Sequence, residues 1–97
     1  MTENETKRIH ATIHGRVQGV GFRAYTYESA NRLELTGWVR NRYNGTVETV
    51  AEGTQTALDV FLKDLQRGNG PSNVTKVDSN WQTATGEFNK FRIRMTV

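Results

Sequence analysis

The chain begins with a stretch in which apolar and polar residues alternate strictly. Every second position carries an apolar side chain, and the positions between them carry charged, hydroxyl or imidazole groups; the apolar positions are Ile9, Ala11 and Ile13. Because successive side chains of a strand point to opposite faces, this alternation predicts a half-buried strand over residues 7–14.

Two later segments carry apolar residues at helical spacing instead. In the first, residues 22–32, the apolar stripe is moderate and starts at Phe22. In the second the stripe is strong, since its members follow the i, i+3, i+4, i+7 pattern: Leu58, Phe61, Leu62 and Leu65. Thr54 is a suitable N-cap for this second helix, and the glycines and single proline of residues 68–71 end it.

An Asn-Gly pair predicts a tight hairpin in the middle of the chain. Asn44 and Gly45 lie between two segments with β-branched residues, residues 35–42 and residues 46–52. This pair is a common signal for a tight hairpin between antiparallel strands. We therefore expect the second and third strands to pair directly.

The last third of the chain predicts two more strands. Residues 74–81 alternate imperfectly, residues 91–95 alternate clearly, and residues 83–87 have the composition of a turn. This pattern leaves open whether residues 74–81 and 88–95 pair with each other as a closing hairpin.

The order of these elements predicts the class of fold. Strand, helix, strand, strand, helix and strand, followed by one further strand, is typical of an α+β protein. We expect a ferredoxin-like βαββαβ sandwich, with a mostly antiparallel sheet and two helices on one face. The chain has 97 residues, which suits one domain over residues 7–97, preceded by a flexible N-terminal segment over residues 1–6.

Composition and charge narrow the classes of function. The chain contains no cysteine, which excludes disulfides, thiolate nucleophiles and cysteine-based metal sites. No apolar run has the length of a membrane span and residues 1–8 are too polar for a signal peptide, so we expect a cytoplasmic protein without a membrane partner. The net charge of +3 comes from basic residues scattered among acidic ones, so we expect no nucleic-acid partner. A small domain without an obvious second apolar face suggests a monomer.

The most specific chemical signal lies between the first strand and the first helix. The segment reads Gly15-Arg16-Val17-Gln18-Gly19-Val20-Gly21-Phe22-Arg23. Its glycines permit positive φ angles and bring backbone N–H groups close to a ligand, and the start of a helix favours an anion. Arg23 falls in the first helical turn, where a cation is unfavourable unless an anion lies nearby. The segment predicts a phosphate cradle, with a plain glycine-rich connector as the alternative.

Two well-known glycine-rich motifs do not fit this loop. A P-loop requires Lys-Ser or Lys-Thr after its last glycine, whereas Phe22 and Arg23 follow here. Residues 19–24 match a relaxed dinucleotide fingerprint. However, the next strand lacks an acidic residue at the expected distance and the chain is too short for that fold.

Asn41 is the second candidate residue of the site. It ends the strand Gly37-Trp38-Val39-Arg40-Asn41, immediately before the hairpin. A strand end beside a helix N-terminus is where ligands meet such sheets, and the Asn41 amide offers both a donor and an acceptor. The alternative is a turn-initiating asparagine that bonds its own backbone.

These segments together resemble the acylphosphatase family. The resemblance is most specific over residues 15–53, with Val17-Gln18-Gly19-Val20-Gly21-Phe22-Arg23 as its strongest part, and it extends in length and element order over almost the whole chain. It implies a ferredoxin-like fold and the metal-independent hydrolysis of acyl phosphates, without a cofactor. The implied partners are a small-molecule acyl phosphate as substrate and inorganic phosphate as product.

The resemblance also implies roles for individual residues. Arg23 corresponds to the phosphate-binding catalytic arginine, and Asn41 to the catalytic residue that positions the attacking water. The backbone N–H groups of the loop would complete the phosphate site; they belong to Gln18, Gly19, Val20, Gly21, Phe22 and Arg23. No metal ligand is implied.

Other polar and aromatic residues have simpler interpretations. His10 and His14 fall on the outward side of the first strand, which favours a surface role over a catalytic one. Trp38 is interpreted as a packing or surface aromatic. Glu48 and Glu52 share one strand face, where ion pairs with Arg or Lys on neighbouring strands are more common than a catalytic carboxylate pair.

Two other functions remain open at this level. Ferredoxin-like sheets also bind RNA, but the clustered aromatics and concentrated basic residues of such modules are missing from this sequence. A regulatory domain for a small anion would keep the phosphate cradle and lack turnover.

Overall fold

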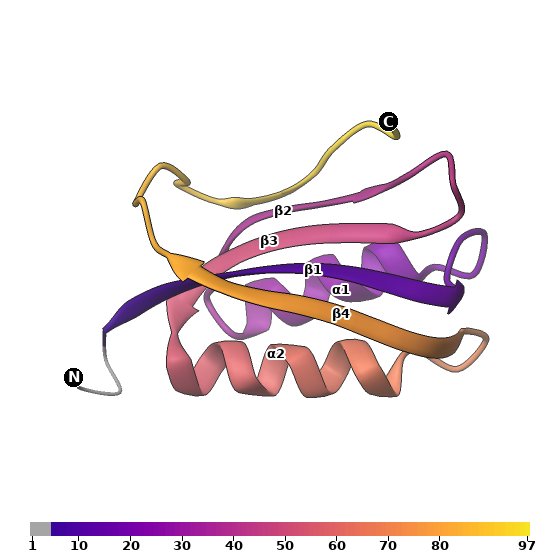
Figure 1. Cartoon of the computed structure of the whole chain (residues 1–97), viewed down its shortest axis with the longest axis horizontal. Helices are drawn as coiled ribbons and strands as arrows, with labels where there is room; N and C mark the ends of the chain where they lie inside the picture. Colours follow the sequence, from indigo (N-terminus) through magenta and orange to yellow (C-terminus); the bar gives the residue numbers. More distant parts are fainter. Residues whose placement is uncertain (1–4) are drawn as a thin grey trace.

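The computed structural model describes residues 5–97. Residues 1–4, which make up most of the expected flexible segment, lie outside the described residues. The described part contains five strands and two helices (Figure 1): β1 (Thr6–Arg16), α1 (Phe22–Arg32), β2 (Thr36–Asn41), β3 (Val47–Thr54), α2 (Gln55–Arg67), β4 (Asn73–Thr83) and β5 (Phe91–Ile93).

The strands form a single sheet in the order β4-β1-β3-β2-β5. The pairs β1–β3, β1–β4 and β2–β3 are antiparallel, and β5 pairs with β2 in parallel. Figure 1 shows both helices on the same face of the sheet, which leaves the opposite face uncovered. The predicted α+β, ferredoxin-like arrangement is confirmed.

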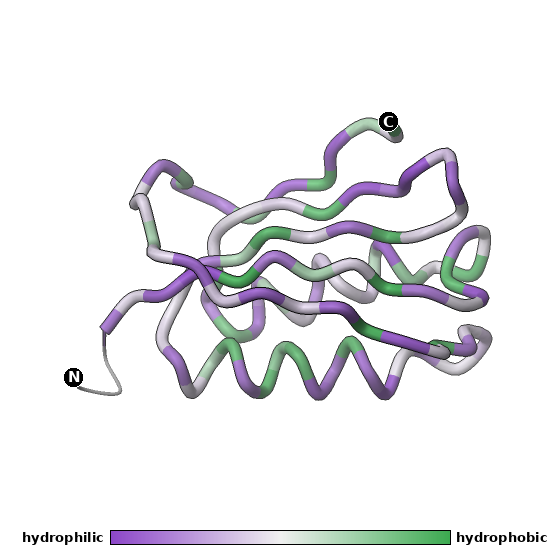
Figure 2. Tube along the Cα trace, viewed as in Figure 1, coloured by the Kyte–Doolittle hydropathy of each residue, from purple (hydrophilic) through white to green (hydrophobic). Residues whose placement is uncertain are grey.

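The alternation along β1 separates the two faces of the sheet. Ile9, Ala11 and Ile13 have no exposed surface and belong to the core under the helices. His10 and His14 lie on the opposite, uncovered face, as the parity predicts, and each contacts a carboxylate there. The same change from apolar to polar residues along the strands is visible in Figure 2.

The second helix follows its sequence signals closely. Thr54 caps α2 by accepting a hydrogen bond from the backbone N–H of Ala57 at 3.2 Å. The buried side chains Leu58, Phe61 and Leu65 cover the sheet. The helix ends at Gly68, as expected.

A polar contact between the helices explains the weaker stripe of α1. The carboxylate of Asp64, buried on α2, accepts hydrogen bonds from Ser29 at 2.7 Å and Arg32 at 2.6 Å, both on α1. Arg67 donates to the same carboxylate at 2.7 Å. Because a buried carboxylate is tolerated only when it is paired, α1 must present polar groups where an apolar stripe would otherwise continue.

The possible closing hairpin of residues 74–81 and 88–95 is wrong. β4 and β5 lie at opposite edges of the sheet, with three strands between them. Phe91 decides the place of β5, because its side chain is 3 % exposed and packs against Tyr27 and Phe61 with ring centroids 6.3 and 6.2 Å apart. Burying such a ring stabilises the folded protein by roughly 1.5–3 kcal/mol. This stabilisation would be lost if β5 paired with the polar strand β4 instead.

Glu52 holds the segment that crosses from β4 to β5. Its carboxylate accepts hydrogen bonds from the backbone N–H groups of Thr85 at 2.9 Å and Gly86 at 3.0 Å, and it pairs with Arg8 at 2.7 Å. The ion pair was expected, but the backbone contacts were not, because residues 83–87 were predicted to be a local turn. Burial raises the pKa of Glu52, yet these hydrogen bonds together outweigh it and hold the pKa below its ordinary value.

We expect Glu52→Gln to make stability less dependent on pH. A carboxylate whose pKa is lowered by folding stabilises the protein above its unfolded pKa and loses that effect as the pH falls through the folded value. The variant should therefore be about 1–3 kcal/mol less stable than the native protein at pH 7. Urea unfolding at neutral pH and at successively lower pH should show this difference shrinking below the ordinary pKa near 4.5. The matched control is Glu28→Gln on the exposed side of α1, and a difference that stays constant with pH would contradict the role of Glu52.

Candidate functional site

The loop between β1 and α1 turns with the help of two glycines in left-handed conformation. Gly19 has a φ of 73° and Gly21 a φ of 78°, which residues with a Cβ rarely adopt. Gly21 is the N-cap of α1 and, having no side chain, provides no capping acceptor. The first turn of α1 also contains no acidic residue. The N-terminus of α1 therefore keeps backbone N–H groups that can donate hydrogen bonds to an anion.

Arg23 lies in that first turn and is half-buried. Among residues 5–97, no carboxylate forms an ion pair with it. Its charge adds to the positive end of the helix dipole rather than compensating it. This local arrangement is unfavourable by itself and becomes favourable when an anion binds.

A pocket of about 230 Å³ brings Arg23 and Asn41 together. The two residues are 18 positions apart in sequence (41 − 23 = 18) and come from α1 and the end of β2. The pocket is lined by Val17, Gly19, Gly21, Phe22, Arg23, Ala24, Asn41 and Ile93. Gln18 and Val20, also expected at the phosphate site, are not among the lining residues. The size suits a small group, since it is below the range of about 300–1,000 Å³ typical of drug-sized ligands.

The Asn41 side chain has a buried oxygen without a hydrogen-bond partner in the described part of the chain. This oxygen is Oδ1, the acceptor atom of the amide. The alternative of a turn-initiating asparagine is wrong for Asn41, because Asn44 has that role. The Oδ1 atom of Asn44 accepts from the backbone N–H of Thr46 at 3.1 Å and from its hydroxyl at 2.7 Å. A buried oxygen without a donor is costly, which points to a ligand or water at this position.

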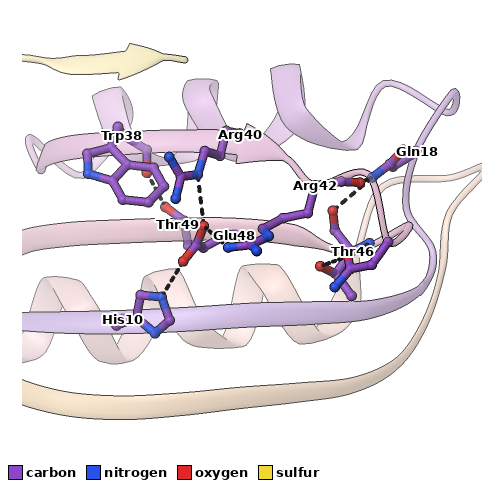
Figure 3. A network of polar contacts seen from close by, with 9 residues as sticks. His10, Gln18, Trp38, Arg40, Arg42, Thr46, Glu48 and Thr49 are labelled. Carbon is purple, nitrogen blue, oxygen red and sulfur yellow. Dashed lines mark hydrogen bonds and ion pairs between the residues drawn. The ribbon is translucent and has the colours of Figure 1, made fainter. Parts of the chain in front are cut away.

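The Gln18 side chain joins the loop to the hairpin that follows Asn41. Its Nε2 donates to the carbonyl oxygens of Arg42 at 2.7 Å and Thr46 at 2.8 Å (Figure 3). The side chain therefore ties the loop to the hairpin that follows β2. Gln18 was expected in the loop, but this contact was not predicted, because its acceptors are backbone carbonyls that no residue type reveals.

Glu48 holds both neighbours of Asn41. Its carboxylate accepts hydrogen bonds from Arg40 at 2.8 Å, Arg42 at 3.2 Å and His10 at 2.7 Å (Figure 3). Burial raises the pKa of Glu48, but these three partners together outweigh it and lower the pKa below its ordinary value. The expected ion pair is confirmed, and it fixes the side chains on either side of the candidate catalytic amide.

Asn69 supports the loop from the opposite side. This residue follows α2, and its Nδ2 donates to the carbonyl oxygen of Val20 at 2.7 Å. A Cβ on Gly21 would lie 3.5 Å from the same Nδ2 atom. No sequence signal identified this contact, because the α2–β4 connection has no regular pattern.

Within residues 5–97, no group of three or more His, Asp or Glu side chains is arranged to hold a metal ion. In the same range no helix combines the length and apolarity that crossing a membrane needs.

Comparison with known proteins is consistent across sequence and structure. The family model "Acylphosphatase" matches residues 9–93. An acylphosphatase from Salinibacter ruber is 44 % identical over 94 residues, which covers 97 % of this chain and 99 % of the relative. Among solved structures, an acylphosphatase from Bacillus subtilis has a TM-score of 0.88 and 35 % identity, covering 91 % of this chain and 98 % of its own. An acylphosphatase from Coxiella burnetii has the same TM-score and 34 % identity, covering 97 % of this chain and 100 % of its own.

We expect Gln18→Ala to destabilise the protein by about 1–3 kcal/mol, because two backbone carbonyls lose their side-chain donor. Chemical denaturation measures this change. The matched control is Gln66→Ala on the exposed side of α2, where alanine is a good helix former and little change in stability is expected. Equal stability of the two variants would contradict the bridging role of Gln18.

Proposed function

The chain belongs to the acylphosphatase family, and on that premise we propose that it hydrolyses acyl phosphates to a carboxylate and inorganic phosphate without a metal ion. One observation carries the proposal: a single small pocket is lined by Arg23 and by Asn41, whose buried Oδ1 has no donor among residues 5–97. The proposal takes the enzyme as a cytoplasmic monomer with one domain, residues 7–97, and no cofactor.

The chemistry of the substrate makes few demands on the protein. An acyl phosphate is a mixed anhydride, and its leaving group is a carboxylate whose conjugate acid has a pKa of about 4.3 if a glutamate side chain is the guide. Such a group leaves without a general acid. The bound phosphoryl group has a second pKa of roughly 6 by analogy with phosphoesters, so its own oxygens can accept a proton. The protein must therefore supply mainly charge stabilisation and geometry.

In this proposal, Arg23 and the backbone N–H groups of the loop bind the phosphoryl oxygens. The guanidinium offers two parallel N–H donors to a pair of oxygens, and the N–H groups of residues 18–23 complete the site. The left-handed Gly19 and Gly21 support this role, because they let the loop turn around a ligand at the start of α1. These donors are in place before the reaction, so they stabilise the developing charge without reorganisation.

In this proposal, Asn41 orients the attacking water. In this step the water oxygen forms a bond to phosphorus while the bond between phosphorus and the acyl oxygen breaks. The bonding pair leaves with the carboxylate, and the proton of the water passes to a phosphoryl oxygen, which yields inorganic phosphate. An oxygen such as Oδ1 of Asn41 can accept a hydrogen bond from that water and hold it in line.

The RNA-binding alternative lacks an accessible aromatic surface at the centre of the sheet. Trp38, on the uncovered face, is 8 % exposed. The guanidinium groups of Arg40 and Arg94 lie 4.5 and 4.9 Å from its ring. A base could stack there only after displacing both arginines.

We expect Arg23→Ala to lower kcat/KM for benzoyl phosphate by about 10³-fold or more, the scale for a charge that contacts the transferring phosphoryl group. Arg23→Lys should not restore activity, because a point charge cannot replace the two parallel donors. A phosphate-release assay with EDTA present measures both variants and tests metal independence in the native protein.

The control for Arg23 is Arg16→Ala, which removes a nearby exposed charge outside the pocket. It should retain most of the activity. Native-like turnover by Arg23→Ala would refute the role of Arg23, and a native protein that binds phosphate but releases none from benzoyl phosphate would favour the regulatory alternative.

We expect Asn41→Ala to lower kcat by about 10²-fold or more while inhibition by inorganic phosphate stays close to native. The physical reason is that the variant still binds the phosphoryl group and loses only the group that orients the water. Steady-state kinetics with phosphate as inhibitor separates the two effects. The matched control is Asn80→Ala on the exposed face of β4, and an equal loss in that variant, or native kcat in Asn41→Ala, would overturn the assignment.

A further inference from the structure

The peptide unit between Val20 and Gly21 is hydrogen-bonded to the rest of the protein on one side only. Its carbonyl oxygen, which belongs to Val20, accepts a hydrogen bond from Nδ2 of Asn69 at 2.7 Å. Its N–H, which belongs to Gly21, donates no hydrogen bond within residues 5–97. Because a peptide unit is planar and trans, its C=O and N–H point in opposite directions. The contact with Asn69 therefore directs the Gly21 N–H away from Asn69.

The lining of the pocket indicates which side of this peptide unit faces a ligand. Gly21 lines the pocket together with Arg23 and Asn41, whereas Val20 and Asn69 do not. Asn69 thus contacts the loop from outside the pocket, and the carbonyl that it binds is directed outwards. The opposite side of the unit carries the Gly21 N–H, which is then available to an anion beside the Arg23 guanidinium.

The local sequence does not fix the orientation of this peptide unit. Gly21 has φ 78° and ψ 12°, close to the third residue of a type II turn, at about +80° and 0°. In a type I turn the same residue has φ about −90°, and the peptide unit before it is rotated so that C=O and N–H exchange places. Glycine adopts both signs of φ with similar ease. A contact from outside the loop must therefore select the orientation.

Asn69 is itself held at the end of α2. It follows Gly68, the C-cap of this helix, whose N–H donates to the carbonyl oxygen of Asp64 at 3.0 Å. The carbonyl oxygen of Asn69 accepts hydrogen bonds from the backbone N–H of Ser72 at 3.1 Å and from its hydroxyl at 2.8 Å. These contacts fix the backbone of Asn69 relative to a helix that packs on the core, so its short side chain is a firm support for the loop.

The contact requires a donor at this position. Turning the Asn69 amide over would place Oδ1 against the Val20 carbonyl, oxygen against oxygen, which is repulsive. The donor must therefore face Val20, although this leaves Oδ1 buried and without a hydrogen-bond partner within residues 5–97. A carboxylate of the same shape would present an oxygen in either rotamer. It would favour the rotated peptide unit, whose Gly21 N–H could then donate to it.

We propose that Asn69 is a positioning residue of the phosphate site, and that it selects the orientation in which the Gly21 N–H points to the bound phosphoryl group. In the rotated orientation the Val20 carbonyl would face the same anion and repel it. This role rests on the proposed function, because it takes the phosphoryl group to bind at Arg23. A merely structural support would be lost equally with any substitution, whereas in this role an acceptor at position 69 is worse than no group at all.

Two substitutions test this role, with inorganic phosphate as the ligand. Asn69→Ala removes the donor, and Asn69→Asp replaces it with an acceptor of the same shape. We expect the dissociation constant of phosphate, measured by calorimetry, to rise about tenfold in Asn69→Ala, the scale of one hydrogen bond to a charged group. Asn69→Asp should raise it about tenfold further, because the Val20 carbonyl then turns towards the anion. Urea unfolding verifies that both variants fold.

The matched controls are Asn73→Ala and Asn73→Asp, at an exposed position of β4 that does not line the pocket. Asn73→Asp adds the same charge near the same connection, so it measures the long-range repulsion of phosphate, which should be small and should shrink at high salt. The loss in Asn69→Asp should persist at high salt. The proposal would be overturned by native affinity in Asn69→Asp, by an equal loss in Asn73→Asp, or by a loss in Asn69→Ala as large as that in Asn69→Asp.

The amide resonance of Gly21 separates this role from a general loosening of the loop. When phosphate is added to the native protein, we expect the Gly21 amide proton to shift downfield, because it forms a charge-assisted hydrogen bond. In Asn69→Asp at saturating phosphate this shift should be lost, while the amide resonances of Phe22 and Arg23 still respond. An unresponsive Gly21 in the native protein, or an equal loss at all three residues in the variant, would overturn the proposal.

These measurements do not depend on turnover. If the native protein binds phosphate but releases none from benzoyl phosphate, the proposed hydrolysis fails. The phosphate affinities and the Gly21 shift then still decide whether Asn69 orients the Val20–Gly21 peptide unit.

Discussion

The site depends on one side-chain amide that joins two distant segments. Gln18 leaves the β1–α1 loop and donates to the carbonyl oxygens of Arg42 and Thr46, which follow Asn41 on the β2–β3 hairpin. Without this bridge the loop and the hairpin would be connected only through the sheet. Positioning a catalytic group demands sub-ångström accuracy, and a doubly bound amide limits movement in two directions at once. Glu48 and Asn69 complete the support from the sheet and from the α2–β4 connection.

Buried polar side-chain atoms away from the site have hydrogen-bond partners within residues 5–97, whereas some at the site have none in that range. Away from the site, the buried carboxylates of Glu48, Glu52 and Asp64 have hydrogen-bond partners. At the site, Arg23 has no carboxylate partner, and two asparagines, Asn41 and Asn69, have a buried side-chain oxygen without a donor, all within residues 5–97. Folding alone does not favour such buried oxygens, and a bound phosphoryl group and a water would satisfy Arg23 and Asn41.

The place of β5 connects the fold to the pocket that Arg23 and Asn41 line. As a parallel edge strand beside β2, it places Ile93 next to both Arg23 and Asn41 at the phosphate pocket. Phe91 packs in the core and holds the strand there, two residues before Ile93. A closing hairpin with β4 would have moved Ile93 to the other edge of the sheet and left the pocket open. The strand order therefore decides whether Ile93 closes this side of the pocket.

The local features were predictable because their causes lie within a few residues. The alternation around Ile9, the stripe around Phe61, the Asn44-Gly45 turn and the loop before Arg23 are each specified by neighbouring residues, and each element forms where it was expected. Expected strand limits differ from the observed ones by up to two residues; for example, β3 continues to Thr54 instead of ending at residue 52. Tertiary hydrogen bonds, rather than residue types, set such limits.

The features that were missed involve partners that are distant in sequence or are backbone atoms. Glu52 binds the N–H groups of Thr85 and Gly86, Gln18 binds two carbonyls, and Phe91 selects the edge of the sheet by packing on Phe61. The sequence by itself determined the elements, their order and the two residues proposed for catalysis, because propensity and motif spacing are local. Only the tertiary structure decided which edge β5 occupies and how Asn41 reaches the loop. Burial and long-range hydrogen bonding depend on where the whole chain has already packed.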